Sequence, residues 1–511
     1  MKNSDKDSNA VVIGAGFAGL AAATRLADLG LSVTLLEKHD MSGGRARVFK
    51  QDGYTFDMGP SWYWMPDVFD QFFERAGTQV KDYLDLVRLD PSYKVWFDDG
   101  PVDIPATSSK VRDLFESIEP GSGPKFDHFM AEAGEKYRLG MAEFVWKPGN
   151  SIWEFAKPQA LFSALSMSMF SSLSRHIRSH FSHPKLIQLL EFPVLFLGSR
   201  PEKSPALYSL MNFADTELGT WYPMGGMYEI VSAMEEVARK KGVTFKFNTE
   251  VTQIVESGGQ ISEVRYEGGS ISCDTVVAAA DYHHVEQRLL PSQWRLYDSR
   301  YWDSRKMSPG ALIYYIGVNK RLPNLEHHNL FFDVPFDPHA DAIYDNPRWP
   351  EDPMFYVAAP SITDRTVAPE GCENLFILIP LAAGLSAKGN EHDILFEKVM
   401  ERLEAAVGSD IRSAITFKRS YSHQDFQDDY HAFRGNAYGL ANTVNQTAFL
   451  KPKMTSKLPG LFYAGQLTTP GPGVPPSLIS GQVAAEEAKR WLFDNNIVAK
   501  KATVKESVGA K

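Results

Sequence analysis

The first 26 residues limit the possible fold most narrowly, because a short apolar run leads directly into a glycine-rich turn. Residues 10–13 are apolar and rich in β-branched side chains, which is typical of a buried parallel strand. Gly14, Gly16 and Gly19 follow as G-x-G-x-x-G, and residues 20–26 favour a helix. Gly14 permits the tight turn, Gly16 lets the backbone approach a pyrophosphate, and Gly19 lets helix and strand pack closely. This order predicts a dinucleotide site at the N-terminus of the helix.

A second strand is predicted over residues 31–36, and it ends at Glu37. A carboxylate at this position is expected to hold a ribose hydroxyl. Gly43, Gly44 and Arg45 follow shortly afterwards as G-G-R. A lone G-x-G-x-x-G is weak evidence, but strand, glycines, helix, strand and acidic residue occur here in the required order. We therefore predict a dinucleotide-binding parallel sheet.

Length and composition exclude several classes of protein. With 511 residues, the chain is expected to form two or three regions around a shared site. The formal net charge is −10 and no cluster of Lys and Arg interleaved with aromatics occurs, so we expect no nucleic-acid partner. Cys273 and Cys372 lie far apart and no H-E-x-x-H is present, so we expect no bound metal. No charge-free apolar run reaches the ~20 residues that span a bilayer.

Four further motifs follow along the chain. They are G-x-x-F-D-x-G-P at residues 53–60, W-x-P-x-G-G at 221–226, a strand ending in glycine at 461–465, and P-G-P-G-V-P at 470–475. Together with G-G-R, they resemble signatures of bacterial-type carotenoid desaturases, including phytoene desaturases and carotenoid 3,4-desaturases, within a flavoprotein group that also contains amine oxidases. The resemblance covers nearly the whole chain. It implies that the proline-glycine turn at 470–475 brings another helix N-terminus to the flavin ring.

The cofactor implied by this resemblance is FAD. Arg45 is expected near the flavin diphosphate, and Val251 is expected to contact adenine through its backbone. The residues expected to bind FAD are Gly14, Gly16, Gly19, Glu37, Lys38, Gly44, Arg45, Gly59, Pro60, Ser61, Val251, Gly465, Gly473, Val474 and Pro475.

The expected fold class is α/β, with a discontinuous Rossmann-like FAD-binding domain, a mixed-sheet substrate domain and a helical cap. The FAD-binding domain is predicted in three parts, residues 1–75, 216–290 and 431–495. We expect a helical cap that faces the substrate and the membrane over residues 76–215, a substrate-binding sheet over 291–430 and a tail over 496–511.

The reaction that the resemblance implies is desaturation of an acyclic carotenoid, of the type that converts phytoene to lycopene. Such a substrate offers nothing polar, so binding has to come from shape and buried apolar area, at about 25 cal/mol per Å². Trp62, Tyr63, Trp64 and Met65 directly follow Gly59 and Pro60, and we expect them to line the substrate site. Aromatic faces can stabilise positive charge that develops on the polyene as hydride leaves.

Glu154 and Lys157 are the candidate catalytic residues, with Glu154 as the proton acceptor. They resemble acidic and basic positions proposed for catalysis in bacterial phytoene desaturases, and they would share one face of a helix. A surface ion pair is the alternative role. Residues 160–181 combine an apolar face with basic residues, which is typical of a helix in a membrane interface and equally of a buried cap helix.

Several functional alternatives remain open at this point. The enzyme could be a 3,4-desaturase of γ-carotene-like or 1′-hydroxy carotenoids, or a redox-neutral carotenoid isomerase. A non-catalytic isoprenoid-binding protein is the alternative from another class. We expect a cytoplasmic protein attached peripherally to the inner membrane, with quinone or oxygen as the electron acceptor.

Overall fold

The parallel sheet predicted at the N-terminus is assembled from separate stretches of the chain. In the computed structural model, which describes residues 8–151, 154 and 171–495, five parallel strands lie in the order β19-β13-β1-β2-β9. Both strands predicted from the glycine motif are present, and β1 lies at the centre of the sheet between β2 and β13. The strands are β1 (Asn9–Ile13), β2 (Ser32–Leu36), β9 (Thr244–Lys246), β13 (Thr275–Ala278) and β19 (Leu461–Tyr463).

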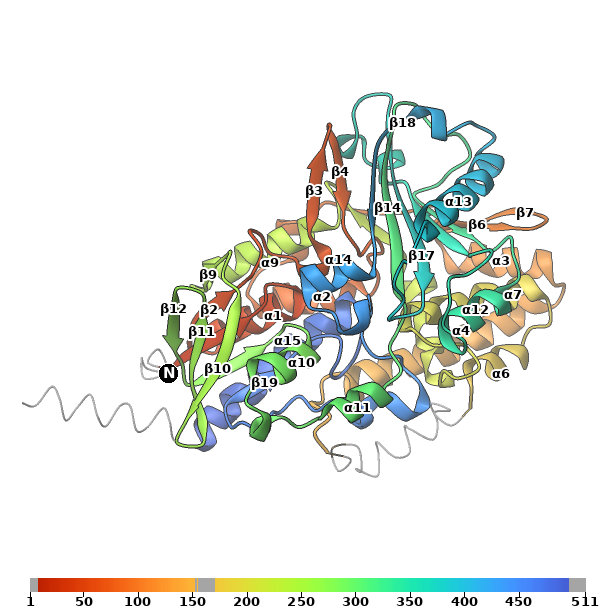
Figure 1. Ribbon diagram of the computed structural model, residues 1–511. Helices are drawn as coiled ribbons and strands as arrows, with labels where there is room; N and C mark the ends of the chain where they lie inside the picture. Colours follow the sequence, from red (N-terminus) through yellow and green to blue (C-terminus); the bar gives the residue numbers. More distant parts are fainter. Residues whose placement is uncertain (1–7, 152–153, 155–170, 496–511) are drawn as a thin grey trace, which may run out of the picture.

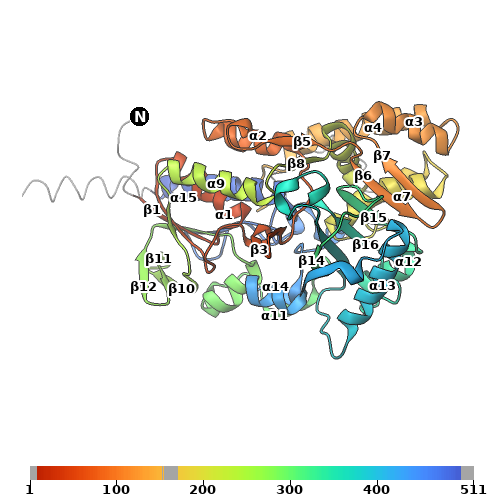
Figure 2. The same cartoon turned by 90° about the horizontal axis from the view of Figure 1, so that it is seen from above.

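Helices α1 (Phe17–Asp28), α9 (Tyr228–Lys240) and α15 (Val474–Asp494) pack around this sheet (Figures 1 and 2). A Cβ on Gly481 of α15 would lie 2.0 Å from the carbonyl oxygen of Ala18, so α15 lies directly against the backbone of α1. This contact places the N-termini of α1 and α15 on the same side of the sheet.

A small antiparallel sheet follows β9. It contains β10 (Val251–Ser257), β11 (Gln260–Tyr266) and β12 (Gly269–Ser272). Cys273 and Asp274 separate β12 from β13 of the parallel sheet. The Asp274 carboxylate accepts a hydrogen bond from the Asn9 backbone N–H at 2.8 Å, which anchors the chain as it passes from one sheet to the other.

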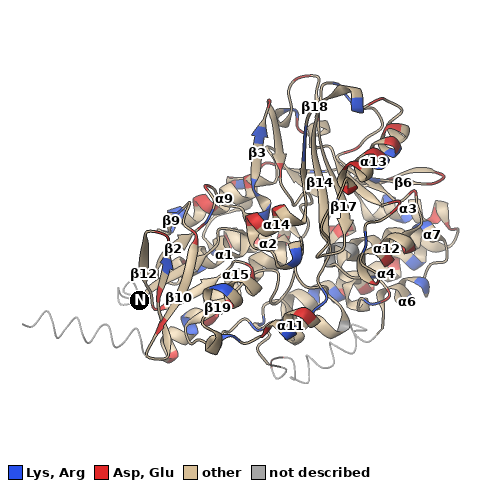
Figure 3. Cartoon of the chain, in the orientation of Figure 1, with Lys and Arg blue, Asp and Glu red and all other residues tan. Residues whose placement is uncertain are grey.

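A seven-stranded mixed sheet forms the other half of the molecule. Its order is β18-β14-β17-β16-β15-β6-β7, antiparallel except for the parallel pair β15 and β6. Strand β14, which lies between β18 and β17, has no charged residue, and charged residues are seen mainly on the surrounding helices, including α13 and α12 (Figure 3). The strands are β6 (Tyr93–Phe97), β7 (Gly100–Ile104), β14 (Gly310–Val318), β15 (His328–Phe331), β16 (Phe355–Ala358), β17 (Glu373–Leu381) and β18 (Ile415–Tyr421).

The remaining elements cap and connect the two sheets. Two further two-stranded antiparallel sheets are present: the hairpin of β3 (Val48–Gln51) and β4 (Tyr54–Asp57), and the long-range pair of β5 (Leu86–Arg88) and β8 (Trp221–Pro223). The cap contains α2 (Pro66–Arg75), α3 (Ser108–Ile118), α4 (Ser122–Leu139), α6 (Leu173–Arg178), α7 (Pro184–Glu191) and α8 (Leu210–Phe213). The other helices are α10 (Tyr282–His284), α11 (Ser299–Ser304), α12 (Phe336–Tyr344), α13 (Glu391–Val407) and α14 (His423–Tyr430).

The predicted fold class is confirmed: a discontinuous parallel sheet, a mixed sheet and a helical cap are all present. The domain boundaries stay predictions. Most of the helix expected over residues 160–181 lies outside the described residues, which include only α6 from that region. Within the described part of the chain, no helix combines the length and the apolar character needed to cross a membrane.

Candidate active site

The loop between β1 and α1 contains glycines for two different reasons: some are needed for the fold itself, and one leaves space for a ligand. Gly14 has φ +96°, and its N–H donates to the Leu36 carbonyl at 2.8 Å. A Cβ on Gly19 would lie 1.8 Å from the Gly14 carbonyl oxygen, so the protein itself requires a glycine there. At Gly16, in contrast, the nearest atom to an added Cβ would be 3.9 Å away, on Gly43. The space beside Gly16 is therefore left for a ligand.

Glu37 is buried at the end of β2, with its carboxylate fixed against the glycine loop. One oxygen accepts from the Ala15 N–H at 2.7 Å and the other from the His39 N–H at 2.9 Å. Each carboxylate oxygen can accept a further hydrogen bond. The neighbouring Lys38 uses its Nζ to donate to the Asp428 carbonyl at 2.7 Å.

Arg45 is a buried cation that lacks a full set of partners. Its Nε has no hydrogen-bond partner among the residues that the structure describes, and one terminal nitrogen lies 3.4 Å from the Asn436 carbonyl. The guanidinium also lies 5.1 Å from the ring centre of Tyr430. Burial lowers the pKa of Arg45, while Asp281 acts in the opposite direction. A buried guanidinium with unused donors fits an anionic group such as a diphosphate.

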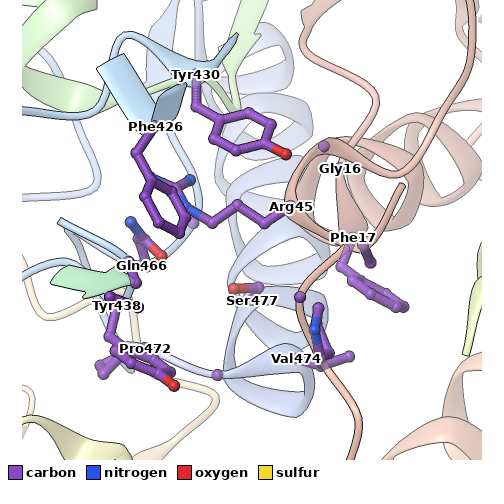
Figure 4. A pocket seen from close by; sticks show the side chains of 18 of the residues that line it. Gly16, Phe17, Arg45, Phe426, Tyr430, Tyr438, Gln466, Pro472, Val474 and Ser477 are labelled. Carbon is purple, nitrogen blue, oxygen red and sulfur yellow. The ribbon is translucent and has the colours of Figure 1, made fainter. Parts of the chain in front are cut away.

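The turn before α15 lies across from the glycine loop, and both line one cavity. The Gly465 N–H donates to the Ser480 hydroxyl at 3.0 Å, which ties the end of β19 to the first turns of α15. Gly473, at φ +110°, precedes the helix, which begins at Val474. Figure 4 shows Arg45 extending across the pocket towards Phe426, with Ser477 and Val474 from the start of α15 below it in this view.

One large cavity connects these loops with an apolar region, and its volume is about 460 Å³. Every residue expected to bind FAD lines it except Gly19, whose role is the packing of α1. The apolar end is lined by aromatic and aliphatic side chains from the cap and the mixed sheet, including Phe192, Met211, Leu330, Phe332, Phe336, Ile343, Met354 and Leu378.

Three of the four predicted substrate-lining residues face this cavity: Trp62, Trp64 and Met65. Tyr63 does not line it. Its ring is fully buried and stacks on Phe69 with ring centres 4.4 Å apart.

Polar contacts fix the aromatic residues beside the loop. Trp62 stacks on His328 at 4.0 Å, and Nδ1 of His328 lies 2.6 Å from the Tyr356 hydroxyl. That hydroxyl donates to Ser61 at 2.9 Å. Burial lowers the pKa of His328 well below its usual value, so the imidazole is neutral near pH 7. The network therefore holds Trp62 without placing a charge beside the cavity.

The candidate catalytic pair is only partly described. Glu154 accepts backbone hydrogen bonds from Gly149 at 2.8 Å and Ser151 at 3.0 Å, and it is not among the cavity-lining residues. Lys157 lies outside the described residues.

Three further residues at the site were missed from the sequence. Tyr344 and Tyr438 line the cavity, and Lys451 is buried behind the turn that contains Gly471. The Lys451 Nζ has no hydrogen-bond partner within the described residues, and burial lowers its pKa to about 7. A Cβ on Gly471 would lie 3.3 Å from this nitrogen.

Comparisons with known proteins identify the family of this chain. A family model described as flavin containing amine oxidoreductase matches residues 17–489. A carotenoid 3,4-desaturase of Haloarcula japonica is 40% identical, over 93% of this chain and 97% of the relative. The chain belongs to the carotenoid desaturase family. A zeta-carotene-forming phytoene desaturase of Myxococcus xanthus is 33% identical to this carotenoid desaturase, over 96% of each chain.

The solved structures support the fold. An oxidoreductase from Methanosarcina mazei has a TM-score of 0.60 at 18% identity, covering 94% of this desaturase and 100% of that chain. The predicted family, enzyme class and cofactor are thereby confirmed: the protein is an FAD-dependent carotenoid desaturase. The open approach at Gly16 and the unused donors of Arg45 fit the diphosphate of that cofactor.

Proposed function

We propose that this enzyme is a 3,4-desaturase, which introduces a double bond near the end of an acyclic carotenoid. The observation that supports this proposal most strongly is the 40% identity to the Haloarcula japonica 3,4-desaturase over almost the full length of both chains. Phytoene, the substrate favoured by the sequence motifs, is the second candidate. Its support is the 33% identity to the Myxococcus xanthus phytoene desaturase.

The apolar end of the cavity suits a hydrocarbon chain. His339 lines it, but Nε2 of this side chain lies 2.9 Å from the Pro380 carbonyl and Nδ1 accepts from the Met354 N–H at 2.9 Å. Its polar atoms are therefore used within the protein. Binding here would come from burial of polyene area at about 25 cal/mol per Å².

Two tyrosine hydroxyls distinguish the cavity from a purely apolar tunnel. Tyr344 and Tyr438 both line it, and neither hydroxyl is hydrogen-bonded to any residue that the structure describes. Burial raises the pKa of Tyr438 to about 12, and burial together with Tyr438 raises the pKa of Tyr344. Both are therefore protonated donors at neutral pH. Such donors would suit a substrate with a hydroxyl at one end, such as a 1′-hydroxy carotenoid.

Desaturation removes a hydride from one carbon and a proton from its neighbour. FAD, when bound, supplies the hydride acceptor. Arg45 and the two helix N-termini would hold its diphosphate, and Trp62 and Trp64 would orient the polyene and stabilise positive charge on it. Glu154 remains our candidate for the proton acceptor on the resemblance to bacterial phytoene desaturases alone; its carboxylate accepts hydrogen bonds from the Gly149 and Ser151 N–H groups.

A substrate comparison tests the proposal. Purified enzyme is supplied with a 1′-hydroxy acyclic carotenoid, with the matching carotenoid without hydroxyl, and with phytoene. We expect the 3,4-desaturated product to form fastest from the hydroxylated compound. Conversion of phytoene alone would refute 3,4-desaturation and establish the second candidate.

Tyrosine variants test the hydroxyl recognition separately. Tyr344→Phe and Tyr438→Phe are expected to lower kcat/KM for the hydroxylated substrate about tenfold or more, because the loss of a buried hydrogen bond costs about 1–3 kcal/mol. Turnover of the substrate without hydroxyl should be unchanged. Tyr266→Phe is the control, because Tyr266 lies on β11 away from the cavity lining. Equal loss for both substrates would contradict recognition of a hydroxyl.

We also propose that the enzyme takes its substrate from a membrane surface and returns electrons to quinone or oxygen. Leu450, 45% exposed, is a large apolar side chain on the surface, next to Phe449, which is 37% exposed, and close in sequence to the exposed Lys453. Flotation with anionic phospholipid vesicles tests this attachment. Loss of flotation in Leu450→Ser would support it, and no flotation of the wild type would refute it.

A further inference from the structure

Two histidines and one glutamate of the helical cap meet at the molecular surface. His128 and Glu132 are one turn apart on α4, and His180 follows the end of α6 by two residues. The ligand atoms of the three side chains lie within 4.8 Å of one another. His128 Nε2 is 3.3 Å from Glu132 Oε1. None of the three side chains belongs to the cavity described above.

A hydrogen bond to the backbone determines which ring nitrogen of His180 has a lone pair available for a metal ion. Its Nδ1 lies 3.0 Å from the carbonyl oxygen of His176. Because a carbonyl only accepts hydrogen bonds, Nδ1 carries the proton and Nε2 keeps its lone pair. Histidines that bind metals usually donate their other ring N–H to such an acceptor, which fixes the tautomer and the ring orientation.

Glu132 lies between His128 on one side and His176 on the other, with one carboxylate oxygen towards each. Its second oxygen, Oε2, lies 3.2 Å from His176 Nε2, which in turn lies 3.2 Å from Lys136 Nζ. His176 is engaged by Lys136 and is left outside the ligand set. Lys136 also donates to the Ser209 hydroxyl at 3.2 Å.

We propose that His128, Glu132 and His180 bind one Zn²⁺ ion. Two imidazole nitrogens and one carboxylate oxygen are ligands that Zn²⁺ prefers, and water completes a four-coordinate site. At bond lengths of about 2.0–2.2 Å, the ligand atoms of a tetrahedral ion are about 3.4 Å apart. His128 Nε2 and Glu132 Oε1 already have this separation, and the contacts of His180 have to shorten by at most about 1.5 Å. Partly exposed side chains at the surface can make this movement by rotation. The bound ion links α4 to the chain that follows α6.

Zinc binding is measured on the full-length, FAD-containing protein after treatment with EDTA and dialysis. Isothermal titration with Zn²⁺ gives the stoichiometry and affinity, and Co²⁺ serves as a spectroscopic probe because tetrahedral Co²⁺ absorbs visible light strongly. We expect one equivalent of Zn²⁺ per chain, a tetrahedral Co²⁺ spectrum that Zn²⁺ displaces, and a higher Tm with metal because only the folded state holds the site.

Variants of the three proposed ligands, with a neighbouring carboxylate of α4 as control, provide a matched comparison. His128→Gln, His180→Gln and Glu132→Gln are each expected to weaken Zn²⁺ binding at least tenfold and to abolish the Co²⁺ spectrum. Glu135→Gln, on the same helix, removes an exposed carboxylate that pairs with Arg138, and it should bind Zn²⁺ as the wild type does. Equal binding by Glu132→Gln and Glu135→Gln would overturn the proposal, as would failure of the wild type to bind one equivalent. Both results are independent of desaturase activity.

Discussion

Replacing Gly16 by alanine should separate cofactor binding from folding. Gly16 has φ −76° and ψ −177°, an extended conformation that alanine adopts freely. The nearest atom to the added Cβ would be 3.9 Å away, an ordinary contact. The apoprotein should therefore unfold with a free energy within about 1 kcal/mol of the wild type, since such a Gly→Ala change alters stability by about 0.4–1 kcal/mol.

The same methyl group occupies the surface that the FAD diphosphate has to approach. If it displaces one charge-assisted hydrogen bond, binding loses about 1.5–3 kcal/mol, which corresponds to roughly a tenfold to hundredfold weaker Kd. The assay is titration of apoprotein with FAD, followed by the quenching of flavin fluorescence, with thermal unfolding of each apoprotein alongside.

Gly19→Ala is the matched control for structural damage. Its Cβ would lie 1.8 Å from the Gly14 carbonyl oxygen, so α1 has to move away from the loop. Overpacking of this kind costs about 1–3 kcal/mol, and we expect the apoprotein itself to be destabilised. A Gly16→Ala protein that binds FAD as tightly as the wild type would refute the assignment of this loop. Equal destabilisation of the apoprotein by Gly16→Ala and Gly19→Ala would refute the conclusion that Gly16 serves cofactor binding and Gly19 serves packing.

Three further variants test individual residues of the site. Arg45→Met should weaken FAD binding at least tenfold in the fluorescence titration. It should also raise the Tm of the apoprotein, because a buried cation with unused hydrogen-bond donors is removed. Unchanged FAD affinity would contradict the binding of the diphosphate by Arg45. Lys451 has a folded-state pKa of about 7, below its unfolded value of about 10.4, so the unfolded state binds more protons between these pH values. The unfolding free energy of the wild type should therefore rise from pH 7 to 10 in denaturant titrations, and Lys451→Met should be more stable at pH 7 and lack this rise. Glu154→Gln should lower kcat at least tenfold with FAD still bound if Glu154 accepts the proton, whereas unchanged turnover would leave it a backbone-capping residue.

Local motifs made the cofactor half of the site predictable. The roles of Gly14, Gly16 and Gly19 follow from a strand, a tight turn and a helix that are adjacent in sequence, and the structure reproduces that order. Glu37 and Arg45 could be placed because each stands at a fixed spacing after the same turn. Such positions depend on few long-range contacts.

The apolar part of the site could not be predicted in the same way, because it is formed by residues that are far apart in the sequence. Tyr344 ends α12 and Tyr438 follows α14, yet both reach one cavity. Tyr63 was expected to line that cavity along with Trp62 and Trp64. Successive side chains of an extended segment point to opposite sides, so residues 62 and 64 face the cavity while residue 63 packs on Phe69.

Product analysis with purified, FAD-loaded enzyme tests the central claim most directly. The enzyme is incubated with an acyclic 1′-hydroxy carotenoid and a quinone or oxygen, and the pigments are separated by chromatography and examined by absorbance and mass. We predict a product two hydrogens lighter, with absorbance at longer wavelength because the new double bond extends the conjugated system. Unchanged mass and absorbance with the hydroxylated carotenoid, its counterpart without hydroxyl and phytoene would contradict desaturation as the function of this site.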